Sequence, residues 1–274
     1  MAPRSLWNGT ITFGAVAVPV KLYTATDDRT VHFHEVHLAD GARIEHRPFC
    51  TKEDKQIDRD EIVKGFAVTK SRYVVVDQEE IDAAGGSRTR IVAVDRFVAL
   101  ADIDPVFFDK TYYLGAGDAG PPARDAYRLL HDALERSGRA AIGRFTFHNR
   151  ERLVAIRAYD KVLALHTMRF ADELVDASDL DVPDVPAKAK PAEVRMAGQL
   201  IDGLHAPFRP EKLHDEHREA VLAAIERRAD GEPIETDEEP EPERPDDLLE
   251  ALKASLPKSK GKPKAKSRRR TKAA

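Results

Sequence analysis

One Gly-rich stretch of the chain could contact a nucleotide. Residues 115–120 read GAGDAG, which matches the G-x-G-x-x-G pattern of dinucleotide-binding loops. We predict a strand before this stretch and a helix after it, as that pattern requires. However, the preceding KTYYL is half polar, whereas a strand buried in a parallel sheet is apolar on both faces. A plain strand-to-helix loop is therefore the favoured interpretation, with nucleotide binding as the alternative.

A second group of residues could bind a metal ion. His32 and His34 lie on one face of a predicted strand, and His37, His46 and Cys50 follow them. Imidazole and thiolate groups are ligands that Zn²⁺ prefers. Because Cys50 is the one cysteine in the sequence, a paired-cysteine site is excluded. We favour exposed histidines on a polar segment, and the prediction is that the chain holds no metal.

The sequence carries none of the common motifs of catalysis. It has no G-x-S-x-G, no G-x-x-x-x-G-K-[ST] and no H-E-x-x-H stretch. The acid-rich residues 235–243 fall in a segment that we expect to be disordered, which cannot hold a preorganised site. We therefore predict a protein that is not an enzyme and that needs no cofactor.

A cluster of arginines is the remaining candidate site within the folded part. Six arginines and one acid, Glu151, lie between residues 136 and 157. Arg144 alternates with two phenylalanines, so its side chain should point away from the core. Arg150 and Arg152 lie at the turn between two predicted strands. A solvated sheet face would explain the cluster by itself, but the charge of the C-terminal segment favours contact with phosphate.

The C-terminal segment divides into an acidic and a basic block. Asp230–Glu250 contains eleven acids, whereas the chain from Lys253 onward has ten Lys or Arg and no acid. A basic block after an acidic spacer favours nucleic acid as the partner, and we expect both blocks to be disordered. The residues of this tail expected to contact DNA are Lys258, Lys260, Lys262, Lys264, Lys266, Arg268, Arg269 and Arg270.

The elements that must position these residues are mostly strands. Period-two alternation over residues 10–23 changes parity at Gly14, as a bulge or sharp bend requires. The pair of strands around Asp160 should form a hairpin, and residues 121–137 should form an amphipathic helix. Further strands are predicted at residues 72–76, 89–98, 111–114, 141–147, 152–159 and 161–168. This pattern predicts a β-barrel or a strongly bent sheet.

Two segments depart from the strand pattern. Residues 28–71 are polar and weakly periodic, and we interpret them as an extended excursion with some β-pairing of its own. After Phe170 a Pro-rich linker leads to predicted helices at residues 191–205 and 213–229.

The stretch PDDLLEALKASL has an apolar edge and should fold on a partner. Its expected partner-binding residues are Leu248, Leu249 and Leu252. The sequence has no apolar run near the ~18 residues that span a bilayer.

Four stretches, taken in order, resemble the prokaryotic Ku family. LWNGTITFGAVAVPVKLYTATDDRTVHFHEVH resembles the N-terminal part of that family. EIVKGFAVTKSRYVVVDQEEID resembles the segment where the family's chain returns to its barrel, and FFDKTYYL and FADEL match further motifs. The resemblance extends from Arg4 to Arg228, and the ordered set of motifs is highly specific.

The resemblance implies an α+β, mainly β fold: a Ku-type β-barrel with an inserted bridge, a helical C-terminal arm and a disordered tail. These parts would be residues 1–175 with the bridge at 28–71, then 176–229 and 230–274. It also implies a homodimeric ring that threads onto double-stranded DNA ends and recruits DNA ligase D in non-homologous end joining. Binding would be sequence-independent and salt-sensitive. A cytoplasmic protein associated with the nucleoid is expected, with no membrane partner.

The resemblance also indicates which residues contact DNA. GRFTFHNR corresponds to the strand and turn that carry DNA-facing basic residues, which implies Arg144, Arg150 and Arg152. The contacts expected in the bridge are Arg43, Arg47, Lys64, Lys70 and Arg72. Two other functions stay open: an architectural protein that coats DNA through its basic tail, and a nucleotide-dependent oxidoreductase that uses GAGDAG.

Overall fold

The computed structural model describes residues 4–70, 72–84, 90–118, 120–147, 150–180 and 190–232. The chain divides into two compact units, Met1–Asp179 and Leu180–Ala274. The first unit contains the strands and the helix that packs on them, and the second contains the two C-terminal helices.

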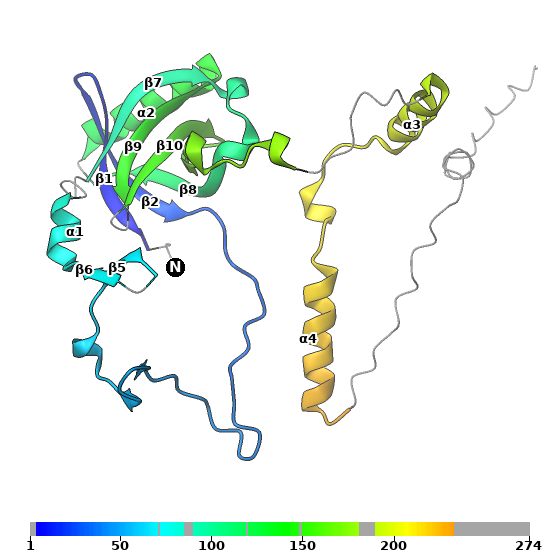
Figure 1. Cartoon of the computed structure of the whole chain (residues 1–274). Coiled ribbons are helices and arrows are strands. Elements are labelled where there is room, and N and C mark those ends of the chain that lie inside the picture. The colour runs from blue at the N-terminus through cyan, green and yellow to red at the C-terminus, as the bar shows by residue number, and fades with distance from the viewer. Residues whose placement is uncertain are drawn as a thin grey trace, which may run out of the picture. The chain divides into compact units, whose positions relative to one another are not determined.

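A closed β-barrel of seven strands forms the core of the first unit (Figure 1). The strands are β1 (Trp7–Phe13), β2 (Val16–Thr24), β7 (Ile91–Ala99), β8 (Phe108–Ala116), β9 (Arg139–Phe147), β10 (Arg150–Tyr159) and β11 (Val162–Met168). Their order around the barrel is β1-β2-β8-β11-β10-β9-β7, and β7 closes the ring on β1. The β1–β7 pair is parallel and the other pairs are antiparallel. The predicted mainly β barrel is confirmed.

The hairpin of β1 and β2 differs from its predicted form. We expected one strand with a bulge or bend at Gly14, but the chain reverses there and Phe13 pairs with Val16. Gly14 has a φ of +55°, a backbone conformation that glycine adopts without strain. The change of parity at Gly14 therefore marks a turn between two antiparallel strands.

Alternate side chains of the strands fill the interior of the barrel. The largest fully buried ones are Ile11, Val18, Val20, Leu22, Val92, Leu114, Val154, Ile156, Leu163 and Leu165. Burying one such side chain contributes about 1.5–3 kcal/mol to the free energy of unfolding. Because these side chains occupy the interior, the outer face and the ends of the barrel are the surfaces that can meet a partner.

Helix α2 (Pro121–Ser137) packs on the barrel and has the predicted bounds. Its apolar side chains Tyr127, Leu130 and Leu134 join the same core as the strands. The Tyr127 hydroxyl donates to the Leu114 carbonyl oxygen (2.5 Å) and accepts from the Leu163 amide (2.8 Å). One hydroxyl thus ties the helix to two neighbouring strands, and its burial raises the pKa of Tyr127.

A long insertion leaves the barrel after β2 and returns at β7. Figure 1 shows it extending away from the barrel as an open loop. It contains two two-stranded sheets and one short helix: β3 (Phe49–Cys50) with β4 (Lys55–Gln56), β5 (Gly65–Thr69) with β6 (Arg72–Val75), and α1 (Gln78–Ala84). The expected β-pairing is confirmed. The strand predicted at residues 72–76 belongs to this insertion and pairs with β5, so its assignment to the barrel was wrong.

The second unit contributes α3 (Pro191–Leu204) and α4 (Glu216–Ala229), close to their predicted bounds. No described residue of either helix is buried, and the apolar Val194, Ile201 and Leu204 are more than half exposed. Asp215 caps α4 by accepting from the Arg218 amide (2.9 Å). Among the described helices, none is long and apolar enough to cross a membrane.

Candidate nucleic-acid interface

Arg144 projects from the outer face of the barrel, as predicted. Its neighbours in β9, Phe145 and Phe147, are buried in the core, whereas its own side chain is 54% exposed. The sequence did not indicate its partners. The Arg144 guanidinium lies 3.7 Å from the Glu151 carboxylate and 4.0 Å from that of Asp95. Two acids therefore compensate the charge of the residue that is the first candidate for phosphate contact.

The surface next to Arg144 is hollowed. The hollow has a volume of about 590 Å³ and is lined by Ile91, Ala93, Asp95, Arg144, Phe145, Thr146 and Glu151. Strands β7 and β9 approach closely behind it, because a Cβ atom on Gly143 would lie 2.3 Å from the Ala93 carbonyl oxygen. Only a glycine fits there, and the register of β7 shifts nearby. This close approach positions Asp95 beside Arg144.

Arg150 and Arg152 do not share a face with Arg144. In the β9–β10 pair, Arg152 stands opposite the core residue Phe145, whereas Arg144 stands opposite Leu153. Directly opposed residues of an antiparallel pair have their side chains on the same face. The side chains of Arg150 and Arg152 are thus on the same face as the core residues Phe147 and Phe145, at the end of the barrel where β10 begins. The sequence indicated an orientation for Arg144 only, and the register shows that the three arginines do not share one face.

The five basic residues predicted in the insertion are spread along it. Arg47 contacts the Glu45 carboxylate (3.3 Å) and the Gln56 side-chain oxygen (3.5 Å). The side chains of the whole set are exposed: Arg43, Arg47, Lys64, Lys70 and Arg72. Residues 28–71 carry eight Lys or Arg and nine acids, so the insertion has no net positive charge. The net charge of the insertion would therefore not attract DNA, and any contact with phosphate must come from individual Lys or Arg side chains.

Two histidines of the insertion contact carboxylates of their own segment. His37 Nδ1 lies 2.9 Å from Asp40, and His46 Nε2 lies 2.6 Å from Glu35. The Ala42 amide and then His37 lower the pKa of Asp40. Among the described residues, Cys50 belongs to no group of three potential metal ligands. In the part of the chain that the structure describes, the one group of three potential metal ligands within reach of one another is on α2.

The GAGDAG stretch is a strand-to-helix connection. The strand before it, β8, lies between β2 and β11 and is antiparallel to both. A dinucleotide-binding loop requires a parallel β-α-β unit, so the nucleotide-binding alternative was wrong. The loop is used structurally: the Gly117 amide donates to the Pro19 carbonyl oxygen (2.9 Å), and Asp118 pairs with Lys21 (2.5 Å).

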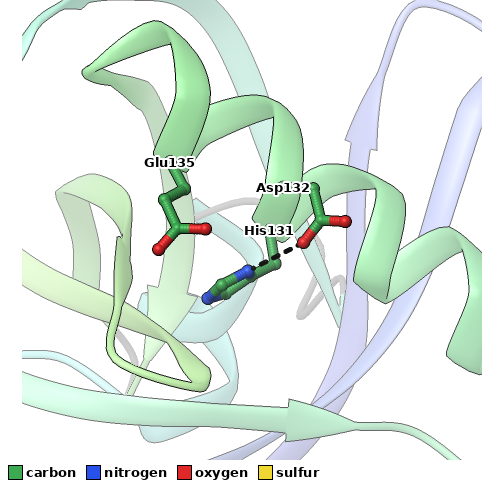
Figure 2. A group of neighbouring side chains, drawn as sticks. All are labelled: His131, Asp132 and Glu135. Carbon is green, nitrogen blue, oxygen red and sulfur yellow. Dashed lines mark hydrogen bonds and ion pairs between the residues drawn. The ribbon is translucent and has the colours of Figure 1, made fainter.

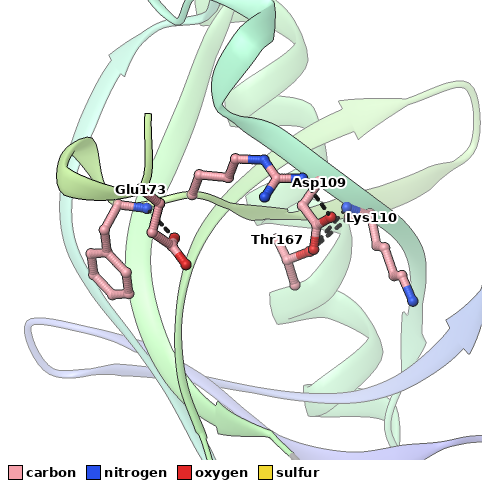
Figure 3. A network of polar contacts seen from close by, with 6 residues as sticks. Asp109, Lys110, Thr167 and Glu173 are labelled. Carbon is pink, nitrogen blue, oxygen red and sulfur yellow. Dashed lines mark hydrogen bonds and ion pairs between the residues drawn. The ribbon is translucent and has the colours of Figure 1, made fainter. Parts of the chain in front are cut away.

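The motifs FFDKTYYL and FADEL stabilise the fold. Figure 3 shows Asp109 and Lys110 of β8 facing Thr167 of β11. The Lys110 amide donates to Thr167 Oγ1 (3.0 Å), and Thr167 Oγ1 donates to Asp109 (3.4 Å). In FADEL, the Glu173 carboxylate accepts from the Phe170 amide (2.7 Å). These contacts lock β8, β11 and the chain that follows.

Arg157, one of the six clustered arginines, is held by its own strand neighbours. Its Nε donates to His166 Nε2 (3.0 Å), and its guanidinium lies 5.1 Å from the centre of the Tyr159 ring. Because His166 Nε2 accepts, its Nδ1 carries the proton and donates to Thr111 Oγ1 (2.9 Å). Burial, and then the charge of Arg157, lower the pKa of His166 to about 4. No pattern in the sequence indicated this network, because it depends on the register of β8, β11 and β10.

The tail residues predicted to contact DNA lie outside the described residues, as do the predicted partner-binding residues. They are Lys258, Lys260, Lys262, Lys264, Lys266, Arg268, Arg269, Arg270, Leu248, Leu249 and Leu252.

Comparison with known proteins agrees with the fold. Residues 12–196 match the family described as "Ku70/Ku80 beta-barrel domain". A protein of Anaeromyxobacter sp. (strain K), "Non-homologous end joining protein Ku", is 44% identical over 92% of this chain and 85% of its own length. Proteins of the same name from Heliobacterium modesticaldum and Bacillus subtilis are 38% and 33% identical, over 99% and 94% of this chain and 100% and 83% of their own. With a closed barrel, a long insertion between β2 and β7 and this similarity over most of its length, the chain belongs to the bacterial Ku family.

Proposed function

We propose that the protein binds the ends of double-stranded DNA and acts in their repair by non-homologous end joining. The observation that carries the proposal is the exposed insertion between β2 and β7, which leaves the barrel as an extended chain. A core connection between two strands needs only a few residues, so the length of this insertion points to a role outside the core. The names of the relatives support the same function.

In this proposal the protein is a homodimeric ring and a scaffold, not an enzyme. Two insertions related by two-fold symmetry would close around the duplex, with the barrels as its cradle. Such a ring meets sugar and phosphate before base edges, so binding would be independent of sequence and sensitive to salt. A ring of this kind loads from a free end.

The C-terminal segments would serve the same function. The basic tail would add non-specific phosphate contacts, and residues 245–256 would recruit DNA ligase D through Leu248, Leu249 and Leu252. Undiminished ligase stimulation after Leu249→Asp with Leu252→Asp would contradict this assignment.

The protein would work in the cytoplasm on the nucleoid. The tail also favours a second candidate, an architectural protein that coats DNA without needing an end.

Competition between linear and closed circular DNA tests the proposal. A chain ending at Arg228 and the full chain are each bound to a short linear duplex at about 150 mM salt, with increasing closed circles as competitor. We expect linear DNA to compete far better than circles for both. Equal competition by circles would refute the ring and favour the coating protein. A subunit mass of one chain at working concentration would refute the dimer.

The arginines of the barrel can be tested through the salt dependence of binding. Replacing Arg144, Arg150 and Arg152 together by Gln should lower the slope of log K against log salt by roughly 2–3 units, at about 0.9 per phosphate contact. Because Arg144 lies on the other face from Arg150 and Arg152, the single variant and the double variant then show which face meets the duplex. An unchanged slope in both would place the DNA elsewhere.

A further inference from the structure

A histidine and two carboxylates meet on α2 beside the turn between β10 and β11, at His131, Asp132 and Glu135. Figure 2 shows Asp132 and Glu135 on either side of the His131 ring. Their potential ligand atoms all lie within 4.8 Å of one another. His131 and Glu135 are four residues apart on a helix, so they share a face. These residues play no part in the proposed contacts with DNA.

The hydrogen bonds of His131 determine which ring nitrogen is available. Nε2 lies 2.9 Å from the Asp160 carbonyl oxygen, which can only accept, so Nε2 carries a proton. In the neutral ring, Nδ1 therefore presents a lone pair. That nitrogen lies 3.3 Å from the Asp132 carboxylate, which is also an acceptor. A metal ion placed beside both atoms could be bound by the two of them at once.

The His131 side chain is only 12% exposed, whereas that of Asp132 is 60% exposed. The Glu135 side chain is exposed as well, so an ion can reach both carboxylates from the solvent. Histidines that ligate metals usually donate their other N–H to a carbonyl or carboxylate, which is the role that Asp160 fills here.

From this geometry we propose that His131 Nδ1, Asp132 and Glu135 bind a divalent transition-metal ion, with Zn²⁺ as the best fit. Ligands placed tetrahedrally at about 2.0–2.2 Å from Zn²⁺ lie about 3.3–3.6 Å from one another, which matches the His131–Asp132 separation. Glu135 is exposed, so its flexible side chain can close the remaining distance. Water completes the coordination. An imidazole ligand disfavours Mg²⁺ and Ca²⁺, which prefer oxygen alone.

The metal would join two parts of the barrel unit. Its histidine ligand is bonded to Asp160, the residue of positive φ (48°) at the turn between β10 and β11. An ion held by α2 would therefore fix the helix against this turn. Because the unfolded chain lacks the preformed site, binding stabilises the folded state.

The experiment is a Zn²⁺ titration of the full chain after treatment with a chelator, by calorimetry and by thermal unfolding. We expect one high-affinity site per chain. The unfolding midpoint should rise by roughly 3–6 °C at free Zn²⁺ about ten times its dissociation constant. Glu135→Gln and Asp132→Asn should each weaken binding by roughly ten-fold or more, since even second-layer changes cost that much. Both residues are exposed, so these variants should fold even if His131→Ala does not.

A matched variant separates this site from the histidines of the insertion. His32→Ala with His34→Ala removes two exposed imidazoles far along the chain, and it should leave the high-affinity Zn²⁺ site unchanged. Loss of that site in this variant, or its survival unchanged in Glu135→Gln and Asp132→Asn, would overturn the proposal. So would an absence of stoichiometric binding by the unaltered chain. Mg²⁺ should not compete at millimolar concentration, and efficient competition would also contradict the assignment.

Discussion

Arg144, which we propose as a DNA contact, is restrained by two neighbouring carboxylates. Asp95 and Glu151 flank it at 4.0 and 3.7 Å, and all three side chains are about half exposed. Ion pairs this exposed contribute little to stability. Their larger effect would be on binding, because phosphate must displace two carboxylates and approach their negative charge.

Removing these two acids should strengthen DNA binding. Asp95→Asn with Glu151→Gln is expected to tighten binding of a linear duplex by roughly three-fold to ten-fold at low salt. Arg144→Gln should do the reverse and lower the salt slope by about 0.9. Titrations at several salt concentrations measure both effects.

A control with the same change of charge is Asp125→Asn with Glu219→Gln, on exposed positions of α2 and α4. If this control tightens binding as much as the Asp95/Glu151 variant, the gain reflects net charge alone and the specific role of Arg144 is refuted.

His166 makes the stability of the barrel depend on pH. It is 8% exposed and neutral, and its folded-state pKa of about 4 lies below the ordinary value of 6.5. Between these values the unfolded chain binds more protons than the folded chain. The free energy of unfolding should therefore decrease as pH falls from about 6.5 to about 4, by up to roughly 3 kcal/mol.

Denaturant unfolding at several pH values measures this loss. His166→Gln keeps a side chain that can accept from Arg157 but does not titrate, so its stability should change less over the same interval. The exposed His37→Gln serves as control and should retain the full loss. A pH profile of His166→Gln that matches the unaltered chain would exclude His166 as the source.

Helix α2 is the element whose attachment depends most on a single polar atom. The Tyr127 hydroxyl satisfies one backbone group of β8 and one of β11 in the interior. A buried backbone group left without a partner costs about 1–3 kcal/mol. The helix thus combines an apolar face that any amphipathic sequence could supply with one specific polar contact.

Tyr127→Phe should lower the free energy of unfolding by roughly 2–4 kcal/mol, because it leaves the Leu114 carbonyl and the Leu163 amide unpaired. Denaturant unfolding checks the loss. Tyr73→Phe removes a hydroxyl from a ring that is 65% exposed and should change stability by less than about 0.5 kcal/mol. Equal effects of the two substitutions would show that the Tyr127 hydroxyl does not hold the helix.

The charge of the whole molecule is distributed unevenly along the chain. Residues 28–71 have no net positive charge, whereas the chain beyond Leu256 carries nine Lys or Arg and no acid. Preference for an end and overall affinity should therefore depend on different parts of the chain. The first would follow from closure of the insertions around the duplex, and the second would come largely from the tail.

Truncation after Leu256 separates these two properties. The shortened chain should bind linear DNA roughly ten-fold or more weakly at about 100 mM salt and show a smaller salt slope. It should keep the preference for linear over circular DNA. Loss of that preference with the tail would assign end recognition to the tail and would contradict the division proposed here.

The sequence alone determined the class of fold and most element bounds. Period-two alternation indicated the barrel strands, and the 3.6-residue period indicated α2 with its observed ends. Local patterns report which side chains are buried, so they were sufficient for Arg144 to be placed outward. The prediction at Gly14 was wrong, because the alternation of apolar and polar residues shifts by one position both at a bulge and at a turn between two strands.

Tertiary structure decided which charged residues meet. Asp95, Arg144 and Glu151 come from β7, β9 and β10, and the contacts of His166 with Arg157 and with Thr111 join β11 to β10 and to β8. Such contacts depend on strand register, and a shift of one residue would reverse every face. For the same reason Arg152, so close to Arg144 in sequence, faces the other way. The alternation of apolar and polar residues along one strand can be read from a short stretch of sequence. The contacts between charged side chains of different strands form only when the barrel has closed.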